Sequence, residues 1–564
     1  MRRASGLAVD GVLVLLFGAL VAGVVGLAQR WEAPIRQAVE IDLSPSALPL
    51  YTLLSLSRGF AAYLLSLAFT LVYGTIAAHS KRAEKVMLPL LDIGQGIPVL
   101  GFLPGLVLGM VALFPKTNVG LELACILMIF TAQVWNMTFS YVGSLRSIPE
   151  ELNEVARLHR FSFWKRFRTV ELSSSVIGLV WNSMMSMAGG WFFLTVNEAF
   201  TLGDRDFRLP GIGSYMAVAI EKGDRRAMAW AIVAMTVMIV AVDQLLWRPL
   251  VVWSQRFRNA DIEGADAPES WVLNLMRRSR FLRRMRLRRR RRPRAPAPPA
   301  SPESAGAVPG GAGERVRAAL VSGLGIAALA AALFGAWKLV GLLVRVPAAK
   351  WLVLAGAVGA TGVRTFSALA LAAAWTLPIG ILIGRSAVWS RRLQPVVQIV
   401  ASFPAPMLFP IVTGVLLVLR VPFGAIAAVL MLLGAQWYVL FNVLAGASAI
   451  PHDLDEAADV YAMKGGARWR MLFVPAVFPF LVTGLVTATG GAWNASIVAE
   501  TLNWRGTALE TFGIGSLITR ATREADFPLL TAGVLTMSLA IVVFNRLVWR
   551  RLYRLAETKY SLNR

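Results

Sequence analysis

The residues best placed for chemistry in this chain are acidic side chains that occur twice, in nearly the same sequence. Residues 148–156 read Ile-Pro-Glu-Glu-Leu-Asn-Glu-Val-Ala, and residues 450–458 read Ile-Pro-His-Asp-Leu-Asp-Glu-Ala-Ala. Acids that begin a helix lie at the positive end of its dipole, and bases such as Arg168 and Arg470 follow in both copies. Such a helix is suited to docking a partner. The alternative is an amphipathic helix that only anchors the chain at a membrane surface.

Each copy is expected to fold as a short helix, a turn and a second helix. Ser147 and Glu150 have the spacing of a capping box, and Pro149 is suited to the first helical turn. In the second copy Gly465-Gly466 is the expected turn. Because Ala457-Ala458 has small side chains, a partner can approach this helix closely.

Several kinds of chemistry have no support in the sequence. There is no Gly-x4-Gly-Lys-Ser/Thr phosphate loop, so we expect that this chain itself binds neither ATP nor another cofactor. The three His residues and one Cys are too dispersed for a metal site, and no nucleophile-elbow motif stands out. We therefore expect a transport component and not an enzyme.

The repeat extends over most of the chain. The second acidic segment follows the first by 302 residues (450 − 148 = 302), and the same offset relates Gly211-Ile212-Gly213 to Gly513-Ile514-Gly515. Upstream the offset is 306, as it is between Pro98 and Pro404. Duplication of one multi-span unit explains this pattern, with the two copies acting as a pseudo-symmetric pair.

Hydrophobic residues make up 56% of the 564-residue chain, which is typical of a membrane protein. Apolar windows of about 20 residues recur, long enough to cross a bilayer, and predict an all-α polytopic membrane protein of about 12 spans. The expected spans are 7–28, 51–78, 87–113, 119–142, 173–199 and 226–249 in the first half, and 317–341, 361–384, 393–419, 422–446, 473–498 and 526–549 in the second.

Charge predicts the orientation and divides the chain. Residues 277–294 hold twelve Arg and no acid, and such an excess keeps a short loop cytoplasmic. With six spans on either side, both termini and both acidic loops are then cytoplasmic. A Pro/Ala/Gly-rich stretch follows, so we expect a first transmembrane domain at 1–276, a linker at 277–314 and a second domain at 315–564. The Arg run is expected to attract anionic lipids but not nucleic acid, because interleaved aromatic residues are missing.

The repeated loop resembles the coupling signature of ABC importer permeases, which reads Glu-Ala-Ala, three residues, Gly, nine residues, Ile-x-Leu-Pro. The second copy has Glu456-Ala457-Ala458, Ala462 in place of Gly, and the closing Pro475. The first copy is more degenerate, with Glu154-Val155-Ala156 and with Arg160 at the Gly position. The resemblance implies that each loop forms a coupling helix that fits a groove of an ATP-binding subunit, and that the two loops differ in strength.

A narrower resemblance points to the nitrate/sulfonate/taurine-type permeases. Residues 402–410, Ser-Phe-Pro-Ala-Pro-Met-Leu-Phe-Pro, look like the Pro-rich span of that family, and Trp493, Glu500 and Gly513-Ile514-Gly515 look like its Trp…Ala-Glu…Gly-x-Gly region. The resemblance implies two tandem type I importer transmembrane domains in the inner (plasma) membrane. It also implies two ATP-binding cassette subunits that carry ATP and Mg²⁺, a periplasmic or lipid-anchored solute-binding protein, and a small anion as the solute: nitrate, sulfonate, taurine or bicarbonate.

The solute pathway is expected where Pro and Gly interrupt spans at equal depth in the two halves, since such backbone is tolerated where it lines water. The candidate pathway residues are Asp92, Gln95, Pro98, Trp191, Glu198, Gln398, Ser402, Phe403, Pro404, Trp493, Asn494 and Glu500. Structural alternatives are a kinked packing helix for the Pro segments, aromatic packing for Trp191 and Trp493, and a hydrogen bond to the following loop for Glu198 and Glu500.

Two other functions fit parts of the sequence. Fused twelve-span permeases also occur among the ferric-iron and thiamine importers, which this chain resembles in architecture. A secondary transporter with inverted repeats is a further alternative. Six spans in each half give parallel repeats, however, and an ion-driven carrier has no use for a coupling loop.

Overall fold

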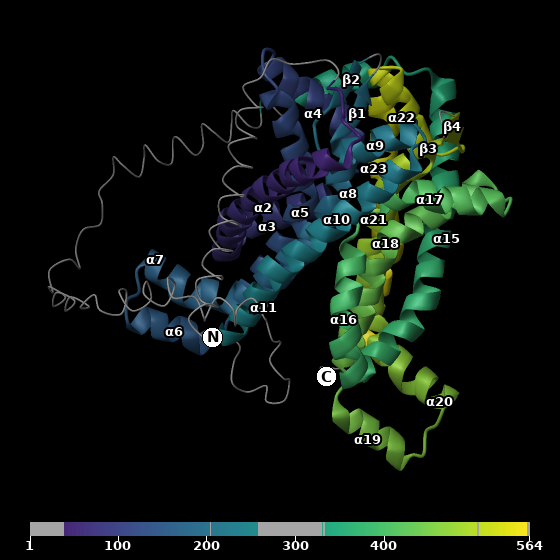
Figure 1. Ribbon diagram of the computed structural model, residues 1–564. Helices are drawn as coiled ribbons and strands as arrows, with labels where there is room; N and C mark the ends of the chain where they lie inside the picture. The colour runs from purple at the N-terminus through teal and green to yellow at the C-terminus, as the bar shows by residue number, and fades with distance from the viewer. Residues whose placement is uncertain are drawn as a thin grey trace, which may run out of the picture.

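The computed structural model describes residues 39–96, 98–202, 205–257, 330, 333–504 and 507–560. The predicted span at 7–28, most of the predicted span at 317–341 and the linker at 277–314 lie outside these residues. In the part that is described, the elements are helices and two short β-hairpins (Figure 1). The predicted all-α class is confirmed.

The first half contains a long series of helices and one hairpin. Its elements are η1 (Pro45–Ala47), α2 (Leu48–His79), α3 (Lys81–Gly96), α4 (Val99–Leu113), α5 (Val119–Arg146), α6 (Glu150–Leu158), α7 (Phe163–Arg166), η2 (Phe167–Glu171), α8 (Leu172–Asn197), β1 (Ala199–Leu202), β2 (Arg205–Arg208), α9 (Ile212–Glu221), α10 (Arg225–Val242), η3 (Asp243–Trp247), α11 (Arg248–Ser254) and η4 (Gln255–Phe257).

The second half repeats this order. Its elements are a short apolar helix at Leu333–Leu343, then α15 (Ala348–Arg385), α16 (Ala387–Ser402), α17 (Ala405–Val418), α18 (Phe423–Ser448), α19 (His452–Val460), α20 (Gly466–Arg468), η5 (Trp469–Phe473), α21 (Val474–Ala499), β3 (Thr501–Trp504), β4 (Thr507–Glu510), α22 (Ile514–Arg523), α23 (Phe527–Phe544), η6 (Asn545–Trp549) and α24 (Arg550–Lys559).

Eight of the described helices are long and apolar enough to cross a membrane. They are Pro45–His79, Val119–Arg146, Phe163–Asn197, Arg225–Phe257, Ala348–Arg385, Phe423–Ser448, Gly466–Ala499 and Phe527–Ala556. Each contains most or all of one predicted span. The hydrophobic windows therefore located these helices correctly, although the observed helices are longer because polar turns continue them beyond the apolar stretch.

The third predicted span of each half is broken. The span expected at 87–113 consists of α3 and α4, which meet at Pro98, and the span expected at 393–419 consists of Val388–Ser402 and Ala405–Val418, bent by 86° before Pro404–Ala405. The interruption expected from Pro and Gly in these spans is therefore present as a break between two helices. Proline has no N–H to donate and disfavours helical backbone in the residue before it, so each helix stops and a new one begins.

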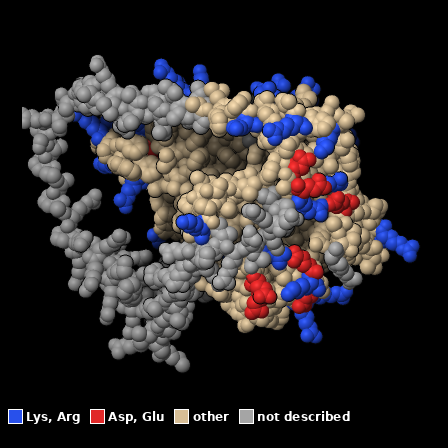
Figure 2. All heavy atoms as spheres, turned by 90° about the horizontal axis from the view of Figure 1, so that it is seen from above, with Lys and Arg blue, Asp and Glu red and all other residues tan. Residues whose placement is uncertain are grey.

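The two hairpins lie together at one end of the molecule, here called the strand end (Figure 1). β1 and β2 pair antiparallel from Ala199↔Arg208 to Leu202↔Arg205, and β3 and β4 pair in the same way from Thr501↔Glu510 to Trp504↔Thr507. The opposite end carries α6, α7, α19 and α20, and is here called the loop end. Charged side chains lie mostly around the margin of the strand end, where acids gather on one side (Figure 2).

The duplication is visible in local backbone detail. The π-helical turns η2 and η5 begin 302 residues apart, as do η3 and η6 (469 − 167 and 545 − 243). Positive φ also repeats at this offset, at Arg160 and Ala462 and at Gly223 and Ala525. Two copies of one backbone have thus kept the same irregularities while their side chains diverged.

The halves pack against each other through corresponding helices. α8 contacts α16 and α17, and α21 and α23 contact α4 and α3 of the first half. A continuous hydrophobic core joins them, since Trp191 and Met187 of the first half belong to the same buried cluster as Trp493 and Val534 of the second. At the loop end the helices of the two halves diverge, and α6 and α19 are far apart (Figure 1).

Candidate translocation cavity and partner-binding loops

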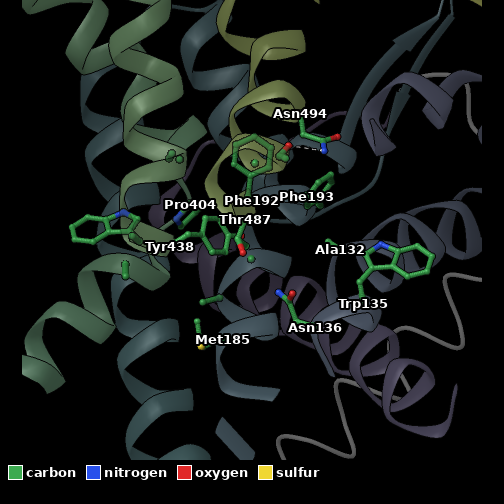
Figure 3. Close-up of a pocket in the computed structure, with 18 of the residues that line it drawn as sticks. Ala132, Trp135, Asn136, Met185, Phe192, Phe193, Pro404, Tyr438, Thr487 and Asn494 are labelled. Carbon is green, nitrogen blue, oxygen red and sulfur yellow. Dashed lines mark hydrogen bonds between the residues drawn. The ribbon is translucent and has the colours of Figure 1, made fainter. Parts of the chain in front are cut away.

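A cavity of about 150 Å³ lies between the two halves. It is lined by Gln95, Val99, Thr131, Ala132, Trp135, Asn136, Met185, Ala188, Gly189, Phe192, Phe193, Gln398, Ala401, Phe403, Pro404, Ala405, Leu433, Gly434, Trp437, Tyr438, Phe441, Thr487, Gly490, Gly491 and Asn494. Figure 3 shows side chains from both halves around it, with Asn136 opposite Tyr438 and Thr487. Residues of both broken helices, α3 and α16, therefore line the same cavity.

The cavity contains no Lys, Arg, Asp or Glu among the described residues that line it. Its polar groups are neutral: the amides of Gln95, Asn136, Gln398 and Asn494, together with hydroxyl and indole groups. The indole Nε1 of Trp135 is buried without a hydrogen-bond partner. A lining of this kind offers N–H and O–H donors to a solute without binding it through a fixed charge.

The sequence located five of the lining residues in advance. Gln95, Gln398, Phe403, Pro404 and Asn494 all line the cavity, and they come from the Pro-interrupted segments and from α21. Pro98 and Ser402 are buried next to lining residues, where Pro98 is the N-cap of α4. The side chain of Asp92 lies outside the described residues.

Four other candidate residues are buried away from the cavity lining. Trp191 and Trp493 are each 2% exposed. Trp191 packs so closely on α2 that a Cβ added at Gly59 would lie 2.8 Å from its ring. Glu198 and Glu500 are fully buried in ion pairs at the strand end. A direct role of these four in translocation stays a prediction.

Sequence reasoning missed the part of the lining that comes from α5 and α18. Trp135 and Trp437 are 302 residues apart, as are Asn136 and Tyr438. The signal available in the sequence was this repeated Trp followed by a polar side chain in the middle of an apolar span. Polar groups at such depth are expensive and face a protein interior or water.

A hydrogen bond between the two halves lies beside the cavity. The backbone N–H of Val99, at the start of α4, donates to Oδ1 of Asn494 on α21 at 2.8 Å. This N–H has no helical partner because it lies in the first turn after Pro98. The amide of one half thus caps the broken helix of the other half.

Glu198 organises the strand end of the first half. Its carboxylate accepts hydrogen bonds from Ser55 Oγ at 2.6 Å, Arg58 Nη1 at 2.7 Å and the Gly213 N–H at 2.8 Å. Arg58 is fully buried and also pairs with Glu122, with Nε–Oε2 at 2.6 Å and Nη2–Oε1 at 2.8 Å. One buried arginine therefore holds two carboxylates.

The second half repeats this network with one carboxylate fewer. Glu500 accepts from Thr361 Oγ1 at 2.7 Å, Arg364 Nη1 at 2.7 Å and the Gly515 N–H at 2.9 Å. The position that corresponds to Glu122 is Gly424 (424 − 122 = 302), where an added Cβ would lie 3.6 Å from Arg364 Nε. The Arg364 side chain is 15% exposed, whereas that of Arg58 is not exposed.

These networks give a physical reason for the repeated Gly-Ile-Gly motif. A Cβ at Gly211 would lie 2.3 Å from the Glu198 carboxylate, and one at Gly513 would lie 2.2 Å from that of Glu500. Only glycine lets the backbone come this close. The carboxylates bind the N-termini of α9 and α22, where the helix dipole favours an anion.

The repeated loops form short helices at the loop end, as predicted, but the capping box was wrong. Pro149 is the N-cap of α6 and no side chain caps the helix, because Ser147 donates its hydroxyl to the Ser144 carbonyl instead. In the second copy α19 ends at Val460 and α20 begins at Gly466, so Gly465 does belong to the turn, with φ of 53°.

Only part of each Glu-Ala-Ala-like segment is available to a partner. Glu456 and Ala457 are exposed, whereas Ala458 is buried against the bundle. In the first copy Glu154 and Val155 are exposed and Ala156 is buried. The last alanine therefore seats the helix on its own half, and the two residues before it face outward.

Large apolar side chains surround these exposed positions. Leu158 and Trp164 are 82% and 73% exposed in the first loop, and Val460 and Tyr461 are 83% and 76% exposed in the second. Exposed apolar groups rimmed by charge are typical of a protein–protein interface. Both loops are thus suited to receive a partner.

The Gly position of the loop signature has a conformational reason. Arg160 and Ala462 occupy it with φ of 45° and 52°, directly after α6 and α19. The next N–H of each loop, Phe161 and Met463, bonds back to Ala156 O and Ala458 O at 2.9 Å. This is the left-handed helix end that glycine favours. The Gly of the loop signature is therefore explained by backbone conformation and not by the size of the side chain.

Together these features define a polytopic membrane protein with two pseudo-symmetric halves, a central cavity and a loop with exposed apolar side chains in each half. The chain belongs to the family described as the binding-protein-dependent transport system inner membrane component, whose model matches residues 70–246 and again 376–560. The two matches confirm the duplication.

Individual relatives are similar over shorter stretches. A nitrate import permease of Leptolyngbya laminosa is 28% identical over 32% of this chain and 60% of its own length. A bicarbonate transport permease of Synechococcus elongatus is 28% identical over 24% of this chain and 48% of its own length. A putative aliphatic sulfonates transport permease of Bacillus subtilis is 27% identical over 33% and 64%. In these three comparisons the chain spans less than two thirds of the relative.

Proposed function

We propose that this chain is a fused permease of an ATP-driven, binding-protein-dependent importer for a small anion. The two copies take the place of two separate permease subunits. Domain limits at 1–276 and 315–564, joined by the linker at 277–314, agree with the two family matches, which fall on either side of that linker. The observation that carries the proposal is the uncharged cavity between two halves that each present a partner-binding loop.

The proposed solute class rests on the cavity and on the relatives. Nitrate, bicarbonate and sulfonate appear in the names of similar permeases. Neutral N–H and O–H donors can replace part of the hydration of an anion, while the absence of Lys and Arg among the described lining residues lets the anion leave again. The described lining residues include no carboxylate, which is unfavourable for ferric iron or thiamine because these solutes are cationic.

We propose two ATP-binding subunits as partners at the loop end and a solute-binding protein at the strand end. Hydrolysis of ATP with Mg²⁺ then takes place on the partners. This arrangement puts both loops, both termini and the linker in the cytoplasm. It is tested by labelling a cysteine at residue 160 or 464 in intact cells: we expect labelling only after permeabilisation, and labelling from outside would contradict the orientation.

The experiment for the solute is ATP-driven uptake in proteoliposomes that hold the permease, its ATPase and the cognate binding protein. Nitrate, bicarbonate and taurine are each supplied as radiolabelled or fluorescently detected probes. We expect one of the three to accumulate. Uptake of Fe³⁺ or thiamine alone would favour the alternative fused importers, and uptake driven by an ion gradient without ATP would favour a secondary transporter.

Charge substitution in the cavity sharpens this experiment. Gln95→Glu and Gln398→Glu keep the side-chain size and add a negative charge beside the solute. We expect each to lower anion uptake about tenfold or more, because a unit charge a few ångströms away is unfavourable by about 3 kcal/mol at intermediate dielectric. Gln95→Met and Gln398→Met are the neutral controls. Equal uptake by the Glu and Met variants would contradict passage of an anion through this cavity.

A further inference from the structure

The two loops are fastened to their transmembrane helices by different side chains. In the second half, Asp455 lies in the first turn of α19 and its side chain is 9% exposed. Its Oδ2 pairs with Arg385, the last residue of α15, and its Oδ1 accepts from Arg468 Nη2 at 3.0 Å. A carboxylate on the loop helix itself thus joins that helix to α15.

A fourth side chain completes this cluster. The guanidinium carbons of Arg385 and Arg468 each lie 5.6 Å from the centre of the Phe473 ring. Arg468 also donates to Asp459 Oδ1 at 2.7 Å, which adds a second contact to α19. Charge-assisted pairs with well-defined geometry hold their elements more firmly than neutral hydrogen bonds do. The helix α19, the end of α15 and the turn η5 therefore form one tied unit.

In the first half three of these four positions hold a different residue type, and the arginine of the loop is retained. The residues that correspond to Asp455, Arg385 and Phe473 are Asn153, His79 and Glu171, while Arg166 corresponds to Arg468. The buried acid is now Glu171, in the turn η2 that leads into α8, and it contacts His79 Nε2 at 2.9 Å and Arg166 Nε at 3.0 Å. The acid has moved from the loop helix to the turn that follows it.

The loop helix of the first half is consequently left out of the ion-pair cluster. Its connection to the cluster is the neutral amide of Asn153, which accepts from Arg166 Nη2 at 3.4 Å. Glu171 joins the end of α2 to η2 without involving α6. The same four positions thus join the loop helix by ion pairs in the second half and by one neutral hydrogen bond in the first.

We infer that Asp455 is a positioning residue that makes α19 and α15 move as one body, and that α6, which has no such ion pair, is less firmly joined to α2. Given the proposed function, on which this inference rests, ATP-driven movement of a partner at the second loop reaches a transmembrane helix directly. At the first loop the same movement is partly lost between α6 and α2. Movement of the partners would then reach the cavity mainly through the second half.

Distances between spin labels measure this difference without any change to the clusters. One label at Val460 and one at Val353 report α19 against α15, and one at Leu158 and one at Leu65 report α6 against α2; all four side chains are well exposed. The labels are placed in a Cys125→Ser background. We expect a narrow distance distribution in the second half and a clearly broader one in the first. Equal widths would overturn the inference.

Substitutions then test the assigned residue in the assembled transporter. Asp455→Asn gives α19 the side chain found at position 153, and we expect the Val460–Val353 distribution to broaden and the ATP hydrolysed per anion imported to rise about tenfold or more. Asp455→Glu retains the charge and should restore both values in large part. In the first half, His79→Arg, Asn153→Asp and Glu171→Phe together should narrow the Leu158–Leu65 distribution.

Failure of this inference can be distinguished from failure of the proposed function. If the wild-type complex shows no ATP-driven uptake, the proposed function is wrong. The distance distributions still test whether Asp455 holds α19 to α15. If the wild-type complex transports and Asp455→Asn leaves both the ATP hydrolysed per anion and the distance distribution unchanged, the positioning role of Asp455 is wrong. The permease assignment then stands. Asp455→Asn protein that transports at the wild-type ratio with a broadened distribution also overturns the mechanical role.

Discussion

The two halves of this chain share a backbone but place their buried charges differently. In the first half Arg58 holds Glu122 and Glu198 at the strand end, whereas Arg364 of the second half holds Glu500 alone among described carboxylates. At the loop end the order is reversed for the loop helices: α19 carries the buried Asp455, and α6 has Asn153 there. Because the two copies need not be identical, the first half has the larger ion-pair network at the strand end, and the second half has the ion-paired loop helix at the loop end.

The largest difference is expected when the strand-end arginines are removed. Arg58→Ala leaves two buried carboxylates without their cation and should lower the free energy of unfolding by about 3–5 kcal/mol. Arg364→Ala leaves one carboxylate that still has the Thr361 hydroxyl and the Gly515 N–H as donors, so we expect about 1–3 kcal/mol. Thermal unfolding of the purified protein in detergent measures both.

The control for this pair is the conservative lysine. Arg58→Lys and Arg364→Lys keep the positive charge but cannot form the two-pronged contact that Arg58 makes with Glu122. Lysine should therefore rescue position 364 better than position 58. Equal losses at the two positions would break the comparison between the strand ends.

The missing carboxylate of the second half can be supplied. Gly424 lies in the first turn of α18, close to Arg364 Nε, and Gly424→Glu adds an acid where both the arginine and the helix dipole favour it. We expect about 1 kcal/mol of stabilisation relative to Gly424→Gln, which controls for the removal of glycine from a helix. A Glu variant no more stable than the Gln variant would show that Arg364 is already satisfied.

The smallest expected effects concern the left-handed residues after α6 and α19. Arg160→Gly and Ala462→Gly relieve about 1–2 kcal/mol of left-handed strain but make the unfolded chain more flexible by about 0.5–1 kcal/mol. We therefore expect a net gain of about 0.5–1 kcal/mol from each. Gly223→Ala, at another left-handed position, should change stability in the opposite direction. A loss of stability at both 160 and 462 would mean that their side chains make contacts that outweigh the strain.

Much of the architecture could be predicted because it depends on hydropathy and repetition. Apolar windows located the eight long helices, and Pro98 and Pro404 marked the segments that meet at the cavity. Hydropathy and proline positions are properties of neighbouring residues, so they can be recognised in a single sequence. Gln95, Gln398 and Asn494, which the sequence singled out, line the central cavity, since polar residues near broken helices have few other places to lie.

What could not be predicted depends on contacts between distant segments. The polar residues of α5 do not all face the cavity, since Gln133 and Thr138 are buried elsewhere, so the sequence did not single out Trp135 and Asn136. The pairing of Arg58 with Glu122 joins residues 64 positions apart on separate helices. The left-handed backbone at Arg160 could not be predicted because neither Arg nor Ala, the residues at this position in the two copies, favours it.

The measurement that tests unequal coupling most directly is ATP-driven anion uptake by Glu154→Lys and Glu456→Lys at matched expression. Both side chains are exposed at the same place on α6 and α19, so neither change should affect folding. We expect Glu456→Lys to reduce uptake about fivefold or more beyond Glu154→Lys, the size of effect that a well-seated interface residue produces. Equal defects in the two variants would contradict the account that the second loop is the main input.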